Sequence, residues 1–387
     1  MRSIKLKSTK RVLSGHLWIF SNEVSSSLKG YQRGELVEVH DRKGGFIGIG
    51  YVNPNSLIAV RILSRQKVKI DIEFFKKRLT TALDYRRIVY PESSSYRVVF
   101  SDSDLLPGLI VDRFSSVVVV QILTAGMELL KDMVLEAIDQ VLNPEVIVIK
   151  NDSPFRALEG LEPQCYIAKG SLKGPVYVEE GGLRFEIDVL GGQKTGFFLD
   201  QRENRRAFSE LINGGVGADL FSYVGAWGLQ LARKAERVVC VDSSRNATAL
   251  IKKNAELNGL SDRVDALCMD VFEFLDRQRA EKIKYDFLVV DPPAFVKSRA
   301  SLKRAISGYR ALNANAMLIL KKGGFLATSS CSYHIGAEDF LDIIRYAARV
   351  TNRYVRVVEF RSQARDHPYL IGMPETRYLK CAILQVL

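Results

Sequence analysis

The feature that most constrains this fold is a strand–loop–helix–strand pattern at residues 216–242. The small and apolar run Val216–Phe221 predicts a buried strand, and a glycine-bearing loop follows it. A helix is predicted over Leu229–Ala235, and Arg237–Asp242 predicts a second strand that ends in an acid. Together these elements predict a βαβ unit of a doubly wound α/β domain, in which ligands bind where the strands end.

The loop of this unit favours a nucleoside ligand without phosphates. Gly225 lets the backbone approach a ligand closely, and Asp242 can accept hydrogen bonds from both hydroxyls of a ribose. The glycine spacing differs from that of dinucleotide-binding loops, which need further glycines around a pyrophosphate. S-adenosylmethionine is the obvious candidate, and Asp219 would meet its cationic end. An ordinary α/β crossover explains the loop equally well, so the rest of the chain has to decide.

Strands and helices continue to alternate to the end of the chain, which predicts a doubly wound parallel sheet over residues 176–387. Further strands are expected at residues 264–270, 285–291, 324–329, 354–361 and 378–387. The glycine-rich segment at residues 191–202 precedes a predicted helix. That segment is either a lid or ligand contact or a capped helix start.

Five of the predicted strands end in polar or reactive side chains. These ends carry Asp219, Asp242, Asp270, Asp291 and the turn Ser329–Ser332. The carboxyl ends of parallel strands meet at one edge of a sheet, so we expect these residues to line one site. A single acid at a strand end means little, whereas the full series is much more specific.

The Asp291-Pro292-Pro293 element has the composition of a cradle for a flipped nucleobase. Two prolines fix an extended turn and remove backbone donors, which leaves carbonyls and the Asp291 carboxylate to accept from an exocyclic amino group. Phe295 can stack on the same planar base. The alternative is a simple turn that ends the strand.

Cys331 is the candidate nucleophile, because it follows a predicted strand among small residues that leave it accessible. A thiolate that attacks C6 of a pyrimidine makes C5 electron-rich enough to take a methyl group. Cys240, Cys268 and Cys381 lie within predicted strands and are expected to be inert core thiols, and Cys165 is expected to be a bystander. The five cysteines are odd in number and dispersed, which predicts a reducing cytoplasm and no metal site.

Residues 1–70 predict a small basic β-barrel. Short strands are expected at residues 34–40, 46–51 and 56–63, separated by glycine-bearing turns. This segment holds 13 Lys and Arg but 4 Asp and Glu, which is most of the excess in a chain of net charge +12. Such asymmetry favours a nucleic-acid partner over a merely solubilising surface. Trp18 and Phe20 could stack on bases, although a small barrel also needs aromatic core.

Residues 71–175 predict a central α+β domain. A helix is expected over Asp71–Tyr90 and another over Glu128–Leu142, with strands at residues 96–100, 108–112, 117–123 and 145–150. The apolar runs are far too short to span a bilayer, and residues 1–10 lack the apolar core of a signal peptide. The chain is therefore expected to work without a membrane.

Taken together, the motifs resemble those of the RlmI-like family, PUA-domain-containing class I methyltransferases that use S-adenosylmethionine to methylate C5 of cytosine in large-subunit ribosomal RNA. Residues 1–70 are similar to a PUA RNA-binding barrel. The remaining marks of the resemblance are Asp104–Asp112, Arg156–Leu161, Thr195–Arg202, Asp219–Tyr223, Asp291–Pro293 and Ser329–Ser332. The resemblance implies a Rossmann-like methyltransferase domain behind the barrel and the central domain, a ribosomal RNA substrate and a homodimer in the cytoplasm.

The resemblance also implies roles for individual residues. Cys331 would be the nucleophile and Asp291 would contact the base, while Pro292, Pro293 and Phe295 would hold the substrate. The implied cofactor-binding residues are Gln201, Arg202, Asp219, Phe221, Ser222, Tyr223, Gly225, Asp242, Ser243, Asp270 and Asp291. Other RNA cytosine methyltransferases carry a second cysteine after the Pro of the Asp-Pro motif, where this chain has Pro293 and Ala294, so the group that assists product release is open.

Two other functions remain open at this point. An RNA methyltransferase that acts on a guanine exocyclic amine would use the same Asp-Pro-Pro cradle and need no thiol. A non-catalytic RNA-binding assembly factor with a vestigial cofactor fold is the second, and the intact series of strand-end acids argues against it.

Overall fold

The computed structural model describes residues 1–295 and 302–387, which form two compact units. Unit 1 comprises Met1–Val178, Asp188–Leu199 and Arg365–Arg377. Unit 2 comprises Glu179–Ile187, Asp200–Ala364 and Tyr378–Leu387. The chain therefore passes between the units several times. In the part of the chain described here, no helix has the length and apolar character needed to cross a membrane.

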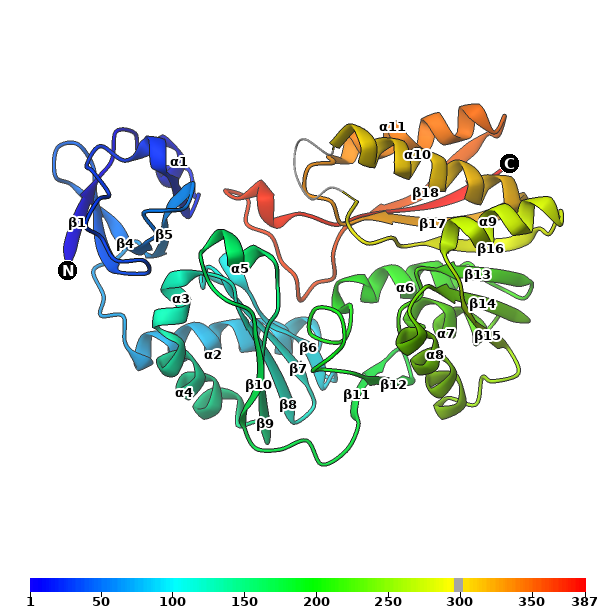
Figure 1. Cartoon of the computed structure of the whole chain (residues 1–387), viewed down its shortest axis with the longest axis horizontal. Coiled ribbons are helices and arrows are strands. Elements are labelled where there is room, and N and C mark those ends of the chain that lie inside the picture. Colours follow the sequence, from blue (N-terminus) through cyan, green and yellow to red (C-terminus); the bar gives the residue numbers. More distant parts are fainter. Residues whose placement is uncertain (296–301) are drawn as a thin grey trace. The chain divides into compact units, whose positions relative to one another are not determined.

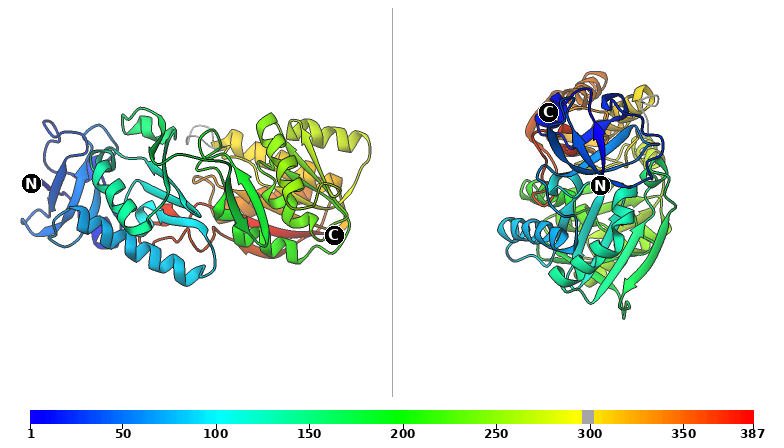
Figure 2. Two further views of the ribbon diagram at one scale, coloured as in Figure 1. Left: turned by 90° about the horizontal axis from the view of Figure 1, so that it is seen from below. Right: turned by 90° about the vertical axis from the view of Figure 1, so that its left-hand side faces the viewer.

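The N-terminal part of unit 1 is a five-stranded sheet with its own core, drawn in blue in Figures 1 and 2. The strand order is β1-β3-β4-β5-β2. The strands are β1 (Arg2–Lys5), β2 (Trp18–Phe20), β3 (Leu36–His40), β4 (Phe46–Val52) and β5 (Ile58–Ser64). Alternate residues of β3 are buried, which is the period expected when one face of a sheet covers a core. The strands predicted near residues 34–63 are confirmed.

The rest of unit 1 is a second five-stranded sheet, of order β10-β9-β8-β7-β6. Its strands are β6 (Ser95–Phe100), β7 (Leu109–Phe114), β8 (Val117–Ile122), β9 (Val146–Asn151) and β10 (Gln164–Lys169). Helices α2 (Ile72–Val89) and α4 (Lys131–Leu142) pack on each other, and α3 (Ala125–Leu129) precedes α4. Strand β10 was not predicted, because it is an edge strand whose largely exposed side chains give no apolar pattern.

The two sheets of unit 1 are joined through buried side chains. Tyr51 of β4 belongs to the core of the second sheet, and its hydroxyl donates to the Pro107 carbonyl over 2.7 Å. The buried carboxylate of Glu159 accepts from Arg61 of β5 over 2.7 Å. Trp18 is half-buried and donates from Nε1 to Asp102 over 2.8 Å. These contacts pack the first two predicted domains into one compact unit, which shows no division at residue 70. The domain boundaries at residues 70 and 175 therefore remain a prediction.

Unit 2 is built on a seven-stranded sheet of order β15-β14-β13-β16-β17-β19-β18. Its strands are β13 (Val216–Leu220), β14 (Arg237–Asp242), β15 (Val264–Cys268), β16 (Tyr285–Val290), β17 (Leu320–Ser330), β18 (Val355–Arg361) and β19 (Lys380–Val386). The α/β prediction is confirmed, but the sheet is mixed because β19 runs antiparallel to β17 and β18. Since the segment between β18 and β19 belongs to unit 1, no crossover helix returns the chain in parallel.

Helices cover both faces of this sheet (Figure 1). Helices α9 (Val271–Ala280), α10 (Leu302–Ile319) and α11 (Ala337–Val350) pack together on one face. On the other lie α6 (Arg202–Glu210), α7 (Ala226–Ala232) and α8 (Arg245–Leu257), together with the hairpin strand β12 (Leu183–Ile187), which pairs with β11 (Val176–Glu180). This layering buries the sheet and leaves its strand ends to carry the polar residues.

Candidate active site

The loop after β13 places a buried acid at the start of the site. Asp219 is fully buried, and its Oδ2 accepts from the Ser222 hydroxyl and, over 2.9 Å, from the Gly228 amide. Its other oxygen, Oδ1, has no hydrogen-bond partner among the described residues. Burial is the largest cause that raises the pKa of Asp219 to about 7, and the nearby carboxylates Asp291 and Asp242 contribute to that rise. A buried carboxylate with an oxygen to spare fits a polar or cationic ligand group.

The same loop is held in an uncommon backbone conformation. Phe221, Tyr223 and Gly225 have φ values of 65°, 52° and 83°, the left-handed region that side chains disfavour. At Gly225 an added Cβ would lie 2.7 Å from Cδ1 of Leu229, so glycine is required by space as well as by φ. Such strain is characteristic of ligand-binding loops, because surrounding contacts have to maintain it.

Asp242 ends β14 and supports this loop. Its Oδ2 accepts from the Tyr223 amide and its Oδ1 from the Ser244 amide, each over 2.9 Å. The side chain is half-buried, and the neighbouring Ser243 is exposed. Each carboxylate oxygen has two acceptor sites, so Asp242 retains capacity for a diol.

The end of β15 is more exposed to solvent than the sequence predicted. Cys268 is exposed, with its thiol 3.6 Å from the Ser243 carbonyl, so the prediction of an inert core thiol is wrong there. The reason is that β15 is the edge strand of the sheet. Asp270 is also exposed and caps α9 through the Phe272 amide over 2.8 Å and the Glu273 amide over 3.2 Å. Its predicted role in binding the cofactor remains a prediction.

The cysteines of the inner strands are buried as predicted. Burial raises the pKa of Cys240 well above its ordinary value and that of Cys381 to about 12. Neither thiol ionises near neutral pH, so neither competes with Cys331 as a nucleophile.

The carboxylate of Asp291, which follows β16, accepts hydrogen bonds from two side chains. The Gln201 amide donates to Oδ1 over 2.9 Å and the Trp227 indole donates to Oδ2 over 3.0 Å. Burial raises the pKa of Asp291 to about 6 against the lowering effect of both donors. Trp227 was not assigned a role from sequence, because nothing local in a helical tryptophan indicates a partner at another strand end.

Gln201 connects three parts of the site. Besides Asp291, its Nε2 donates to the Ser329 hydroxyl over 3.1 Å, and its Oε1 accepts from Asn204 over 2.6 Å. The neighbouring Arg202 lies 3.4 Å from the buried carboxylate of Glu180, which also takes two hydrogen bonds from Arg205. The segment at residues 191–202, which was predicted to be either a lid or ligand contact or a capped helix start, thus carries Gln201, whose side chain contacts the strand ends.

The Asp-Pro-Pro turn and its aromatic neighbour are only partly open. Pro292 is buried and Pro293 exposed. The half-buried Phe295 ring packs on Tyr309 of α10, with the ring centroids 4.6 Å apart. Stacking of Phe295 on a base remains a prediction, and its present partner is a core side chain.

Cys331 lies just past β17 in a turn of buried serines. Ser330 and Ser332 are buried, whereas Cys331 is half-buried. The Ser332 hydroxyl lies 3.2 Å from the Tyr309 hydroxyl, and the Ser332 carbonyl accepts from Lys380 over 2.7 Å. Strands β16 and β17 are neighbours in the sheet, so the thiol and Asp291 follow adjacent strand ends.

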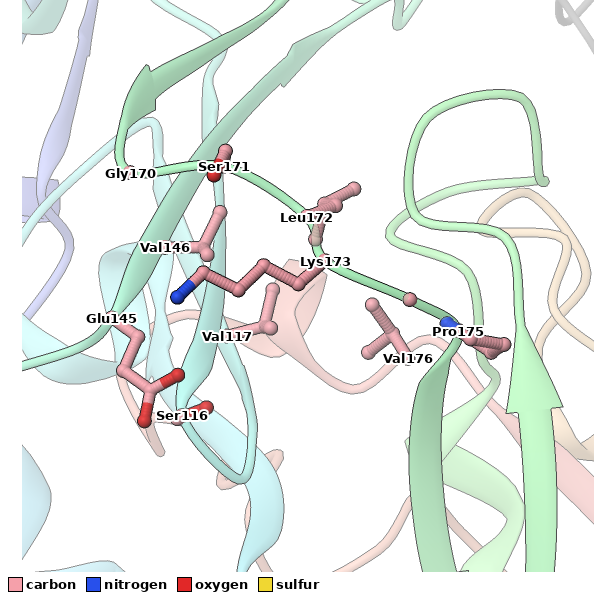
Figure 3. Close-up of a pocket in the computed structure, with 11 residues that line it drawn as sticks. Ser116, Val117, Glu145, Val146, Gly170, Ser171, Leu172, Lys173, Pro175 and Val176 are labelled. Atoms are coloured by element: carbon pink, nitrogen blue, oxygen red, sulfur yellow. The ribbon is translucent and has the colours of Figure 1, made fainter.

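A separate open hollow lies in unit 1 (Figure 3). It has a volume of about 440 Å³, and the Lys173 side chain crosses it toward the strand that carries Val146. Its lining residues are Ser116, Val117, Glu145, Val146, Gly170, Ser171, Leu172, Lys173, Gly174, Pro175 and Val176. This lining holds one acid, Glu145, and neither a cysteine nor a histidine, so the site of interest remains at the strand ends of unit 2.

The hydrogen-bond acceptors at these strand ends fit S-adenosylmethionine. Asp219 offers a buried unpartnered oxygen, and Asp242 offers acceptor sites one strand away. The loop between them contains the close-approach glycine Gly225 but no pyrophosphate-type glycine series.

Comparisons with known proteins agree with this geometry. A PUA-like domain family matches residues 3–65, and the S-adenosylmethionine-dependent methyltransferase family matches residues 163–368. Ribosomal RNA large subunit methyltransferase I of Pseudoalteromonas translucida is 36% identical to this chain over 390 residues, which cover 98% of this chain and 97% of that protein. A candidate SAM-dependent methyltransferase from Streptococcus mutans has the same fold, with a TM-score of 0.86, 20% identity and 100% of both chains covered. A candidate methyltransferase solved with SAH gives a TM-score of 0.87 with the same identity and coverage.

Proposed function

Because this chain belongs to the family of S-adenosylmethionine-dependent methyltransferases that includes ribosomal RNA large subunit methyltransferase I, we propose that it methylates C5 of a cytosine in large-subunit ribosomal RNA. The assignment to C5 of cytosine rests on one observation. A half-buried thiol, Cys331, lies one strand away from the base-binding candidate Asp291. A guanine-amine methyltransferase has no use for a thiol at that position.

In this proposal the strand ends of β13, β14 and β15 hold the cofactor. When bound, S-adenosylmethionine supplies an electrophilic methyl group. The loop from Asp219 to Gly225 receives its methionine end, Asp242 with Ser243 receives the ribose, and Asp270 the adenine. Gln201 and Arg202 border the methionine end, where Gln201 also orients Asp291.

The substrate base would lie between the Asp-Pro-Pro turn and Cys331. The Cys331 thiolate adds to C6, the new S–C6 bond pushes electrons to C5, and C5 then takes the methyl group. Asp291, whose pKa of about 6 lies near working pH, accepts from the cytosine amino group or shares a proton with N3 as the thiolate adds. A base then takes the C5 proton, the electrons of that C–H bond reform the C5=C6 double bond, and the S–C6 bond breaks to release the Cys331 thiolate. Pro292, Pro293 and Phe295 would line the base.

Unit 1 supplies the RNA-binding part of the proposal. The PUA-like match falls on the first sheet, where Lys5, Lys7 and Lys10 are exposed, and their charge favours phosphate contacts. The proposal includes a homodimer in the cytoplasm, which light scattering of the purified protein and fractionation of cells test directly.

Trapping the covalent adduct tests the chemistry. The enzyme is incubated with S-adenosylmethionine and ribosomal RNA fragments that carry 5-fluorocytosine. Once C5 has been methylated it holds fluorine in place of a removable proton, so the wild-type protein should remain bound to RNA as a slow band on a denaturing gel. Cys331→Ala should give no band, and Cys165→Ala, which removes an exposed thiol of unit 1, should trap normally.

Two results would contradict the cytosine assignment. One is a band that persists in Cys331→Ala. The other is that the wild-type enzyme methylates unmodified RNA but never forms the adduct with the fluorinated base. Either result would favour a guanine exocyclic amine as the methyl acceptor.

A further inference from the structure

Behind the candidate nucleophile lies a buried cation that the reaction described above does not use. Lys380, the first residue of β19, is only 7% exposed. Lysines are almost never buried to this extent unless something holds the ammonium group. We propose that Lys380 is a positioning residue that fixes the Cys331 turn and raises the thiolate fraction of Cys331, an inference that rests on the proposed function.

The antiparallel pairing of β17 and β19 brings Lys380 to this turn. Ser330 and Lys380 are directly opposite in the register of the two strands. The ammonium Nζ donates to the Ser332 carbonyl over 2.7 Å and to the Tyr378 carbonyl over 2.8 Å. Because Ser332 follows Cys331 in the chain, the hydrogen-bonded carbonyl belongs to the residue next to the thiol.

The turn is also held from its other side. Tyr309 of α10 lies 3.2 Å from the Ser332 hydroxyl, and the Ser332 amide donates to the Ser330 hydroxyl over 3.3 Å. With Lys380 gripping the carbonyl of the same residue, Ser332 is fixed through its side chain, its amide and its carbonyl. A turn fixed in this way gives the thiol a defined position, which a nucleophile requires to add to C6 from one face of the base.

The charge of Lys380 has a second effect. A nearby cation favours the ionised form of a thiol, and in a buried setting the interaction is screened far less than in water. Other titratable groups near the turn are Tyr309 from α10, whose hydroxyl lies 3.2 Å from that of Ser332, and Tyr378, which is hydrogen-bonded to Asp200 and whose carbonyl accepts from Lys380. Asp291 follows the neighbouring strand β16. Burial raises the pKa of Tyr309, so this phenol stays neutral, and ionised Asp291 opposes thiolate formation. Lys380 is cationic and hydrogen-bonded to the turn.

Three substitutions separate the charge from the hydrogen bond. Lys380→Arg keeps the charge, Lys380→Gln keeps a donor for the carbonyl but removes the charge, and Lys380→Met removes both. Each full-length protein is alkylated with iodoacetamide across a pH series, and the modified Cys331 peptide is quantified by mass spectrometry. The exposed thiols Cys165 and Cys268 serve as references in the same sample.

We expect Lys380→Gln to raise the pH midpoint of Cys331 alkylation by about one unit, so that modification at pH 7 slows roughly tenfold, while Lys380→Arg stays near the wild-type midpoint. The reference thiols should keep their midpoints in every variant. Should Lys380→Met fail to fold, the Gln and Arg pair still decides the matter.

An unchanged Cys331 midpoint in Lys380→Gln overturns the inference, and so does an equal rise in Lys380→Arg, which would indicate geometry without charge. Alkylation needs neither RNA nor methyl transfer. It therefore reads the Lys380 effect independently of adduct trapping, and a failure of either experiment can be told from a failure of the other.

Discussion

The side-chain amide of Gln201 donates a hydrogen bond to Oδ1 of Asp291 over 2.9 Å, although the two residues are 90 positions apart in the chain. Trp227 donates to the other oxygen of the same carboxylate. Both donors favour the ionised form, whereas burial raises the pKa to about 6. The balance leaves an acid that changes its protonation near neutral pH, at the position where a base is expected to bind.

Removing the Gln201 amide should therefore slow the reaction and move its pH profile. In Gln201→Met, loss of a donor to the carboxylate raises the Asp291 pKa, so the acidic limb of kcat/KM should shift to higher pH. The rate should fall roughly 10- to 100-fold, which corresponds to about 1–3 kcal/mol for a broken buried hydrogen bond. The control is Arg206→Ala, which changes an exposed residue of α6, the helix that follows Gln201. A lower rate with an unchanged acidic limb would mean that Asp291 is not the group whose titration sets that limb.

Asp219 should make the protein less stable as pH rises. Its folded-state pKa of about 7 lies above the ordinary 3.8, so the folded state holds this proton more tightly than the unfolded state. Stability is then lost between those two pH values, by roughly 4 kcal/mol at most. Asp219→Asn should match wild type near pH 4 and exceed it near pH 8 in urea unfolding without cofactor, while binding S-adenosylmethionine more weakly. Asp265→Asn, an exposed acid paired with Arg237, should show no such gain.

Asp242 should contribute to cofactor affinity through its charge. Asp242→Asn keeps one side-chain oxygen, which can accept from one of the two backbone amides that Asp242 now binds, and it loses the charge-assisted bonds to the ribose. Calorimetry should show S-adenosylmethionine binding weakened by about 1–3 kcal/mol. Asp262→Ala, an exposed acid in a nearby turn, should bind as wild type does. Equal affinity of wild type and Asp242→Asn would place the ribose elsewhere.

The basic residues of the first sheet should set the salt dependence of RNA binding. Deleting residues 1–70 would expose core, since Tyr51 belongs to the hydrophobic cluster of the second sheet. Neutralising Lys5, Lys7 and Lys10 to Gln avoids this, because all three are exposed. If each contacts one phosphate, the slope of log affinity against log salt should fall by about 2. The matched control neutralises three exposed lysines of unit 2, Lys252, Lys282 and Lys322. An unchanged slope in the first variant would mean that the charge acts only on solubility.

Local sequence patterns were sufficient for most of the helices and strands and for the series of strand-end residues. The strand Arg237–Asp242 has the predicted bounds, because an apolar pattern is a property of neighbouring residues. Helix α7 begins three residues earlier than predicted, at Ala226, since the glycine loop gave no clear start signal. Because carboxyl ends of parallel strands meet at one edge of the sheet, Asp219, Asp242 and Asp291 could be assigned to one site from order alone.

Contacts across the fold could not be predicted in this way. The exposure of Cys268 follows from the edge position of β15, and the burial of Lys380 follows from the antiparallel insertion of β19. Strand order and direction are decided by packing of the whole sheet, which no stretch of neighbouring residues encodes. The sequence by itself therefore determined which residue types stand at the strand ends. Only the tertiary structure decided which side chains surround them, and hence that Gln201 and Trp227 hold Asp291 and that Lys380 grips the turn of Cys331.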